Sequence, residues 1–331
     1  MKHYLRKRIK YFYPISALLL ILVSCSINQS VGKQKFDELT TWNNTAVKSE
    51  IVQFVENVSN PGNPNFVPQS KRIAVFDLDG TLLCERPMYV SALMAIEHLK
   101  KQISQDSNLV NIQPYKAIAE NNLKYLWHHP DELIGPDHFG KTQQEYIASV
   151  DLFFEKQINP DNDIPYRNLF YVPMINLIKY LHAYGFQVYI VSGSTQGFIR
   201  AFCEKYLYIP QNFIIGSEIK LSFQYSDSAV KFIRDNKFES INADTIKALN
   251  IKNRIGIKPI FAFGNSNGDL QMLQLSFSNN LPNIQLVLDH DDSKREYEYS
   301  KEKLLKICKK NGWKIVSMKN DFRIIFAGEK R

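Results

Sequence analysis

Two aspartates, Asp77 and Asp79, lie one residue apart directly after the apolar run 73–76, and a glycine follows them. An unbroken apolar run of this kind predicts a strand that is buried in a parallel sheet. Open α/β folds bind their ligands just beyond the carboxyl ends of such strands. One carboxylate placed there can attack a phosphorus centre, and the other can carry a proton to and from the leaving oxygen. The pair therefore predicts a phosphoryl-transfer site.

Closely spaced aspartates before a glycine have two other interpretations. A calcium-binding loop counted from Asp77 needs glycine at its sixth position and glutamate at its twelfth, where this chain has Leu82 and Met88. The calcium loop is therefore excluded. A plain turn stays open because Asp and Gly favour turns, but the buried strand that precedes the pair favours the catalytic interpretation.

Three more apolar runs predict buried strands, at 188–191, 260–263 and 284–288, and each is followed by small, polar or acidic residues. Helical patterns lie between the strands, as at 174–184 and 245–254. Alternating strands and helices indicate right-handed crossovers and a parallel sheet, so the fold class is α/β. Because the carboxyl ends of parallel strands meet at one edge, we expect the residues that follow the four strands to form one site.

The strand pattern disappears between residues 85 and 170, directly after the strand that carries the aspartates. This stretch predicts helices at about 88–102, 115–127 and 142–155. A helical segment inserted there would lie over the site as a cap, exclude water and shape the choice of substrate. A helical subdomain that only packs against the rest is the alternative.

The start of the chain has the pattern of an export signal. Five basic residues fall within residues 1–10, and the apolar run 11–23 that follows is too short to span a bilayer, which takes ~20 residues. We therefore expect a signal peptide over residues 1–24. The sequence around Cys25 resembles the lipobox of bacterial lipoproteins, which implies cleavage before Cys25 and attachment of lipid, palmitate included, to it.

This resemblance predicts a protein of the cell envelope, anchored by its lipid to a bacterial membrane and facing the periplasm or the exterior. Residues 25–41 would form a lipidated, polar tether. An ordinary signal peptide with a chance cysteine is the alternative. Three further cysteines, Cys84, Cys203 and Cys308, form no disulfide framework because their number is odd, although one bridge stays open.

Composition limits the remaining classes. The 331 residues fit one large domain or two smaller ones, and the 44% apolar content is enough for a full core. The formal charge is +8, but without the five basic residues of the first ten the chain has 36 basic against 33 acidic residues. Such a balance lacks the clustered basic face of a nucleic-acid-binding protein, so no nucleic-acid partner is expected.

Taken together, the motifs between residues 70 and 290 resemble those of the haloacid dehalogenase superfamily of phosphatases. The resemblance implies a parallel-sheet, Rossmann-like core with a helical cap inserted after the first strand. Residues 42–84 and 171–331 would form the core, and residues 85–170 the cap.

The resemblance also implies roles for individual residues. Asp77 would attack phosphorus, and Asp79 would act first as general acid and then as general base. The Ser192 hydroxyl and the Gly193 amide would hold phosphate oxygens, with Ser194 beside them in the substrate site. A strand-to-helix turn with an N-cap serine is the alternative for the segment Ser192–Ser194.

Two further motifs are implied by the same resemblance. A lysine that neutralises phosphate charge corresponds to Lys247, with Lys258 as the second candidate. Asn265 and Asp269 correspond to the acidic motif that helps to hold Mg²⁺, together with Asp77 and Asp79. Asn265 stands where many relatives have aspartate; its amide oxygen can still bind a hard cation, but with one negative charge fewer.

Short segments such as Pro87–Tyr89 and Tyr171–Met174 resemble a bacterial subgroup of phosphoserine-phosphatase-like hydrolases, in which asparagine is usual at the fourth motif. Glu85 lies near the position of a substrate-binding glutamate in those enzymes. The function that follows is a Mg²⁺-dependent phosphomonoesterase acting on a small organic phosphate through an aspartyl-phosphate intermediate. A phosphotransferase and a non-catalytic lipoprotein that binds a ligand or partner are the alternatives.

Overall fold

The computed structural model describes residues 39–134, 136–159, 163–299 and 301–328. The predicted signal peptide, Cys25 and most of the predicted tether lie outside the described residues and stay predictions. Among the described residues, no helix combines the length and apolar character that crossing a membrane requires.

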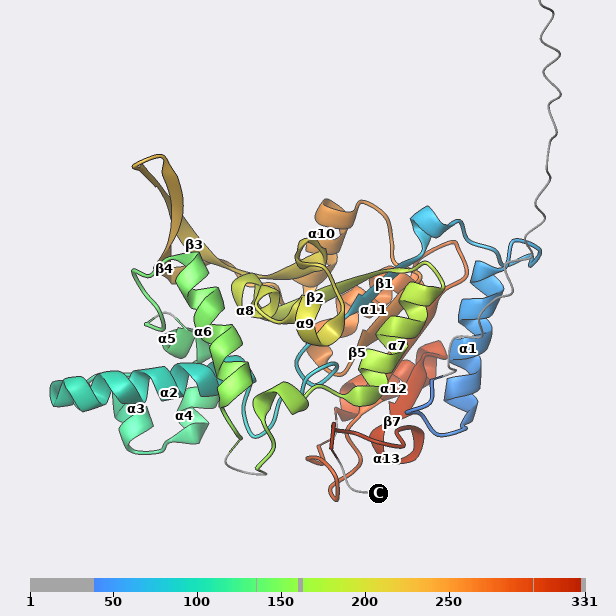
Figure 1. Ribbon diagram of the computed structural model, residues 1–331. Coiled ribbons are helices and arrows are strands. Elements are labelled where there is room, and N and C mark those ends of the chain that lie inside the picture. The colour runs from blue at the N-terminus through green and yellow to red at the C-terminus, as the bar shows by residue number, and fades with distance from the viewer. Residues whose placement is uncertain (1–38, 135, 160–162, 300, 329–331) are drawn as a thin grey trace, which may run out of the picture. The chain divides into compact units, whose positions relative to one another are not determined.

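The described strands form one sheet with the order β4-β3-β2-β1-β5-β6-β7 (Figure 1). All neighbouring strands are parallel except β3 and β4, which form an antiparallel hairpin. The strand bounds are β1 Ile73–Phe76, β2 Gln187–Thr195, β3 Ile214–Ser226, β4 Ala229–Ser240, β5 Phe261–Gly264, β6 Ile284–Asp289 and β7 Lys314–Ser317. The chain order reverses on either side of β1, and this reversal is where open α/β sheets bind ligands.

Helices surround the sheet and also form a separate group beside it (Figure 1). The helices of that group are α2 Val90–Gln105, α3 Tyr115–Ala119, α4 Leu123–His128, α5 Pro130–Ile134 and α6 Gln143–Lys156. The other α-helices are α1 Ala46–Ser59, α7 Val172–Ala183, α8 Gln196–Arg200, α9 Cys203–Leu207, α10 Thr245–Ile255, α11 Leu270–Phe277, α12 Glu302–Asn311 and α13 Met318–Asp321. Short 3-10 helices are η1 Gln69–Lys71, η2 Ser107–Asn111, η3 Tyr166–Asn168, η4 Gln211–Phe213 and η5 Asn267–Asp269.

The side chains of β1 alternate between two apolar clusters, one on each face of the sheet. Ala74 and Phe76 belong to a cluster with buried residues of α1 and α7. Ile73 and Val75 belong to a second cluster with buried residues of α10, α11 and α12. Helices therefore cover both faces of the sheet, which leaves its edge at the strand ends for the site.

The predicted strands at 73–76, 188–191 and 284–288 are confirmed, and the strand expected at 260–263 is found one residue later. The second strand is longer than its apolar run, because it continues through the segment Ser192–Ser194 to Thr195. Its register against β3 shifts between Val191 and Thr195, as it does at a β-bulge. Ser192–Ser194 therefore lie within an irregular strand end rather than in a plain turn.

The hairpin of β3 and β4 was not predicted from the sequence, and it makes the sheet mixed rather than wholly parallel. Its turn residues Asp227 and Ser228 both have positive φ, at 51° and 61°. This is the backbone of the two-residue turns that match the twist of paired strands. Figure 1 shows the hairpin extending beyond the sheet toward the group of helices α2–α6. The two parts meet where Thr142, before α6, pairs with Ile233 of β4.

The folded part of the chain begins earlier than the predicted boundary at residue 42. Leu39 is fully buried in the main apolar cluster, and the Thr41 hydroxyl donates a hydrogen bond to Asn176 Oδ1 at 3.0 Å. These residues were expected in the tether because the segment around them is polar. The apolar contact of Leu39 places them in the fold instead.

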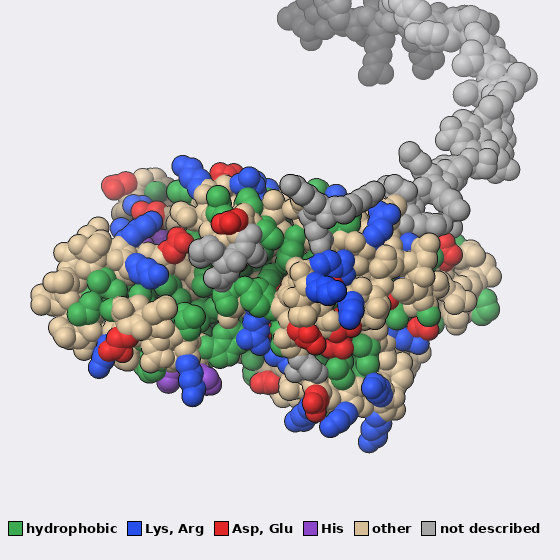
Figure 2. All heavy atoms as spheres, turned by 90° about the horizontal axis from the view of Figure 1, so that it is seen from below, with side chains coloured by type: hydrophobic (Ala, Val, Ile, Leu, Met, Phe, Trp, Pro, Cys, Tyr) green, Lys and Arg blue, Asp and Glu red, His purple; other side chains and the backbone are tan. Residues whose placement is uncertain are grey.

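Charged side chains are spread widely over the face that Figure 2 shows, where lysine and arginine alternate with acidic groups and broad apolar areas.

The cysteines Cys84, Cys203 and Cys308 are buried and free, so the bridge that the sequence left open is not formed among them.

Candidate functional site

Asp77 begins the turn that follows β1. Its backbone N–H donates to Phe263 O on β5 at 3.0 Å, which continues the pairing of β1 beyond its last residue. The chain then folds back at once, because the Leu83 N–H donates to Leu78 O and the Gly80 N–H to Leu83 O. This tight turn presents the side chains of Asp77 and Asp79 at the edge of the sheet, and both are buried.

Lys247 joins the first aspartate to the last acidic residue of the predicted site. Its Nζ lies 2.6 Å from Asp77 Oδ1 and 2.6 Å from Asp269 Oδ1, and the three side chains are buried. Lys247 is in the first turn of α10, as its sequence position predicts. Lys258, the second candidate, lies on the surface and donates to Ser278 O at 2.9 Å. The structure therefore brings Lys247 into the cluster and leaves Lys258 outside it.

Asp79 contacts the bulged end of β2. Its Oδ2 accepts a hydrogen bond from Ser194 Oγ at 2.7 Å and a longer one from Ser192 Oγ at 3.4 Å. The Ser192 hydroxyl accepts in turn from the Ser194 N–H at 3.0 Å. Asp79 Oδ1 is buried and has no hydrogen-bond partner among the described residues. A buried carboxylate oxygen without a partner is costly, so this atom is a candidate contact for a ligand.

Asn265 lies opposite the turn after β1. Its Oδ1 accepts from Thr81 Oγ1 at 3.2 Å, and its Nδ2 donates to Glu85 Oε1 at 3.3 Å. Gly80 makes this approach possible: its φ is +75°, and a Cβ at that position would lie 2.0 Å from Asn265 Nδ2. The amide of Asn265 is therefore held against the aspartate turn from the next strand of the sheet.

The two carboxylate oxygens of Asp269 make separate contacts. Its Oδ1 meets Lys247, while its Oδ2 accepts from the backbone N–H groups of Asn265 and Ser266 at 3.0 and 2.9 Å. It thus fixes the loop after β5 and the lysine at the same time. With both oxygens used in this way, Asp269 supports the predicted metal site from behind, and its role as a direct ligand stays a prediction.

The carboxylates of the cluster repel one another and are poorly solvated. Burial and the charge of Asp269 raise the pKa of Asp77 well above its ordinary value, while Lys247 acts in the opposite direction. Burial raises the pKa of Asp79 to about 6; hydrogen bonds from Ser194 and Ser192 oppose the shift and the charge of Glu85 adds to it. Burial alone would lower the pKa of Lys247, but Asp269 and Asp77 outweigh it and raise that pKa.

The donor set fits a hard divalent cation. Four buried carboxylates, those of Asp77, Asp79, Glu85 and Asp269, face the single buried ammonium of Lys247 among the described residues of the cluster. The available donors are carboxylate, amide and carbonyl oxygens, which Mg²⁺ prefers, and sulfur is not among them. The excess negative charge and the unpartnered Asp79 oxygen give a cation a physical reason to bind there.

Two positioning contacts were missed from the sequence. Asn242 is fully buried, and its Nδ2 donates to Ser192 O and Ile215 O, each at 3.0 Å. It therefore holds the end of β2 against β3. No local pattern indicated this, because the contact joins residues that are 50 positions apart.

His290 supports the aspartate turn from the other side. Its Nε2 lies 2.8 Å from Gly80 O, and its Nδ1 lies 3.1 Å from Glu296 Oε2. Glu296 also accepts from the Tyr171 hydroxyl at 2.8 Å. The position of His290 at the end of β6 was the available signal, since the ends of all four predicted strands were expected to meet.

A pocket of about 630 Å³ opens in front of the cluster. Asp77, Asp79 and Lys247 line one part of it, together with Gly193 and Ser194. Other parts of its wall come from the helical group and from the hairpin and the segment after it; they include Tyr89, Ala92, Ile134, Phe238 and Ile241. Its volume is in the range of small-molecule sites, and the polar groups converge at one place.

Comparison with known proteins agrees with this geometry. The family of haloacid dehalogenase-like hydrolases matches residues 74–274, which is more than half of the chain. No curated protein matches the chain.

Several solved structures match the chain. One is a conserved, functionally unknown protein from Anaerococcus prevotii DSM 20548, with 15% identity and a TM-score of 0.54 over 82% of this chain and 91% of that one. A protein with unknown function from Bordetella pertussis Tohama I has 14% identity and a TM-score of 0.49, over 74% and 98% of the two chains. A phosphoserine phosphohydrolase-like protein from Francisella tularensis has 18% identity and a TM-score of 0.40, over 74% and 94%. The first of these supports the α/β fold, and none of them indicates an activity at such identities.

Proposed function

The chain belongs to the haloacid dehalogenase-like hydrolase family, and we propose that it is a phosphomonoesterase that works through an aspartyl-phosphate intermediate. The observation that carries this proposal is the contact between Asp77 and Lys247 at the carboxyl end of β1, with Asp79 two residues further along the chain. A buried carboxylate held by a cation is a nucleophile that can meet an anionic substrate without strong repulsion.

The residues account for both halves of the reaction. Asp77 attacks phosphorus, the bond between phosphorus and the leaving oxygen breaks, and Asp79 gives its proton to that oxygen. Water then attacks the aspartyl phosphate, Asp79 accepts a proton from the water, and Asp77 is released with inorganic phosphate. A pKa of about 6 suits Asp79 to both roles, because it can hold or release a proton near neutral pH.

Lys247 and the end of β2 orient the phosphoryl group in this scheme. The lysine offsets charge on the phosphoryl oxygens, and the Ser192 hydroxyl and the Gly193 N–H are candidate donors to them. Two hydrogen bonds hold Ser192 in place before substrate arrives: Asn242 Nδ2 donates to Ser192 O, and Ser192 Oγ donates to Asp79 Oδ2. Such preorganisation reduces the reorganisation needed in the transition state.

Mg²⁺ is the cofactor we propose. Asp77, the backbone carbonyl of Asp79 and the amide oxygen of Asn265 are the groups that would hold it, with Asp269 as support. When bound, it supplies positive charge that keeps Asp77 ionised and offsets charge on the transferring phosphoryl group.

The substrate we propose is a small organic phosphate with some apolar surface. Tyr89, Phe238 and Ile241 give the pocket its apolar wall, and Glu85 lies at its edge near Asn265. Residues 85–170 would serve as a cap over this pocket. The lipid anchor at Cys25 would hold the enzyme at the cell envelope, where it meets soluble phosphate esters.

A screen of phosphomonoesters that measures phosphate release, with and without Mg²⁺, tests the proposal. We expect release from one class of ester, and it should require the metal. If an alcohol added as acceptor captures the phosphoryl group in place of water, the protein is a phosphotransferase. Absence of turnover on every ester, with ligand binding retained, would contradict the enzymatic proposal and favour the binding lipoprotein.

A further inference from the structure

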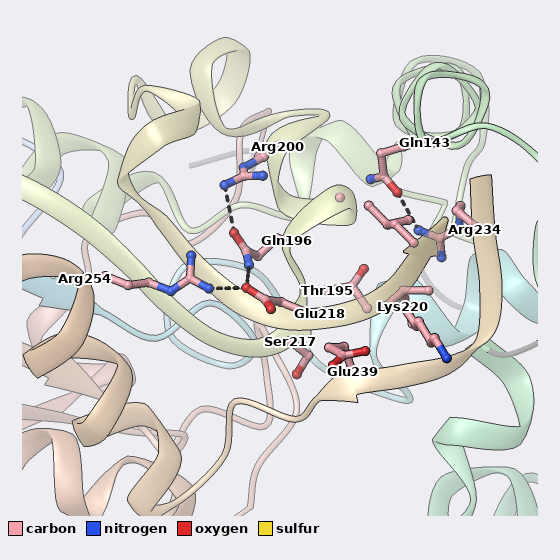
Figure 3. Close-up of a pocket in the computed structure, with 13 residues that line it drawn as sticks. Gln143, Thr195, Gln196, Arg200, Ser217, Glu218, Lys220, Arg234, Glu239 and Arg254 are labelled. Atoms are coloured by element: carbon pink, nitrogen blue, oxygen red, sulfur yellow. Dashed lines mark hydrogen bonds and ion pairs between the residues drawn. The ribbon is translucent and has the colours of Figure 1, made fainter. Parts of the chain in front are cut away.

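A second pocket of about 430 Å³ lies between the hairpin, α6, α8 and α10 (Figure 3). It shares no lining residue with the pocket in front of Asp77. The two pockets are nevertheless neighbours along the chain, because Ser194 lines the first and Thr195 lines the second. The proposed reaction uses nothing in this second pocket.

The lining of the second pocket carries more positive than negative charge. Its basic residues are Arg200, Arg234, Arg254 and Lys220, and its acidic residues are Glu218 and Glu239. In Figure 3 one side of the pocket is a chain of contacts from Arg200 through Gln196 and Glu218 to Arg254. Glu218 therefore neutralises Arg254, and no comparable partner among the described residues serves the cations on the other side.

Arg234 is the unusual residue of this pocket. Its side chain is only 2% exposed, yet no ion pair neutralises it among the described residues. Nη1 donates to Gln143 Oε1 at 3.1 Å, and Nε is buried without a hydrogen-bond partner. Its guanidinium carbon lies 3.7 Å from the centre of the Tyr146 ring, which offsets part of the burial. A buried cation that no carboxylate neutralises is costly, and an anion would remove that cost.

Asp137 is the carboxylate that acts on the charge of Arg234, and it forms no ion pair with Arg234 among the described residues. Oδ1 of Asp137 is already occupied, because Nδ1 of His98 and Nδ1 of His138 lie 2.7 and 2.5 Å from it. This oxygen therefore contacts the two imidazoles and not the guanidinium of Arg234.

The neighbours of Arg234 hold it toward the pocket. Gln143 begins α6, and it packs so closely on α8 that a Cβ at Gly197 would lie 2.0 Å from Gln143 Nε2. Lys220 on β3 lines the same pocket, is exposed and forms no ion pair among the residues that the structure describes. One buried and one exposed cation therefore face the same space without a carboxylate paired to either.

We propose that this pocket binds the oxyanion group, carboxylate or phosphoryl, of a small molecule, with Arg234 as the buried anchor and Lys220 at the rim. The planar guanidinium suits either group, since it can donate two parallel hydrogen bonds. Gly197 and Leu221 contribute an uncharged part of the lining. The occupant would lie beside Thr195 and Gln196, which directly follow the segment Ser192–Ser194.

Thermal unfolding of the purified protein tests this proposal without any measurement of activity. The Tm is recorded in increasing sodium sulfate, which represents a phosphoryl group, and in sodium succinate, which represents carboxylates. Potassium chloride at matched ionic strength corrects for screening. We expect a saturable rise in Tm of a few degrees with at least one of the two anions. The anion that acts identifies the chemistry of the ligand.

Arg234→Met is the decisive variant, because methionine keeps the apolar contact with Tyr146 and removes the charge. We expect the variant to keep its Tm in chloride and to lose the rise caused by the oxyanion. A lower Tm in chloride with an undiminished rise would mean that Arg234 only packs, and it would overturn the proposal. Ser192→Ala controls for anions that bind in the first pocket, because it removes a proposed donor to phosphoryl oxygens there. This substitution is introduced into wild type and into the Arg234 variant. It should leave the difference between the two in the oxyanion-induced rise in Tm unchanged.

Lys220→Met decides the question if the Arg234 variant does not fold, because Lys220 is exposed. We expect it to raise the half-saturating oxyanion concentration severalfold. Lys231→Met is its matched control, since Lys231 is an exposed lysine of β4 that does not line the pocket. Equal half-saturation in wild type and in the Lys220 variant would overturn the proposal.

Discussion

Lys247 Nζ lies 2.6 Å from Asp77 Oδ1, although 170 residues separate them in the sequence. The contact depends on the sheet, because the pairing of β1 with β5 brings the helix that precedes β5 beside the end of β1. It gives the proposed nucleophile its positive neighbour, and it supports the first prediction.

Lys247→Met should lower kcat/KM by about 100-fold or more, because it removes a preorganised charge from the phosphoryl site. It also leaves Asp77 and Asp269 buried without their cation, which should cost on the order of 3–5 kcal/mol in the free energy of unfolding. Denaturant unfolding and steady-state kinetics measure the two effects. Lys258→Met is the control. If the Lys258 variant lost as much activity as the Lys247 variant, the assignment of Lys247 as the lysine that contacts phosphate would be wrong.

Chelation of divalent metal should abolish phosphate release, and Mg²⁺ should restore it. Asn265→Asp should lower the half-saturating Mg²⁺ concentration severalfold, because it adds one negative charge to the oxygen ligands. The same change puts a carboxylate where the Asn265 amide now lies 3.3 Å from Glu85, so the variant should unfold at a lower temperature than wild type when metal is removed. Asn267→Asp, two residues away and exposed, is the control. An unchanged requirement for Mg²⁺ in the Asn265 variant would argue against a metal-binding role for residue 265.

Asp79→Asn should affect substrates according to their leaving groups. An amide cannot transfer the proton that a poor leaving group needs, so alkyl phosphates should lose about 100- to 10,000-fold in kcat/KM. An aryl phosphate with a strongly acidic leaving group should lose much less. Parallel kinetics on the two ester classes measure the difference, and an equal loss on both would contradict the general-acid role.

Cys25→Ser should release the protein from the membrane fraction, or leave it uncleaved at higher mass, with catalysis intact. The reason is that the lipid, and not the folded domain, is proposed to anchor it. Fractionation and mass spectrometry of the mature N-terminus measure the outcome, with Ser30→Ala as the control. A native protein that begins at Met1, or beyond Cys25 without lipid, would refute the anchor.

The strands that carry the proposed chemistry could be predicted because each is a short apolar run with a polar end. That pattern follows from burial on both faces of the sheet, as in β1, where Ala74 and Val75 face opposite clusters. Because the carboxyl ends of parallel strands lie at one edge of the sheet, it also followed that Asp77, Ser192 and Asn265 would lie near one another.

The hairpin could not be found in the same way, because most of its residues are exposed and no glycine marks its turn. Its alternation, with Leu221, Phe223 and Tyr225 every second residue, was a usable signal. The contacts of Asn242 and Arg234 gave no local signal, since their partners are distant in the sequence. The lysine candidates were separated only by the fold, which buries Lys247 and leaves Lys258 on the surface.

The central claim is that Asp77 is the nucleophile, and the rate of phosphate release by Asp77→Asn tests it most directly. The substitution keeps the shape of the side chain, so circular dichroism and Tm should show a folded protein. With the best ester from the screen and saturating Mg²⁺, the account predicts a loss of at least about 1,000-fold in kcat, because the amide is not a nucleophile at phosphorus. A folded Asp77→Asn variant that releases phosphate within about tenfold of the wild-type rate would contradict the account.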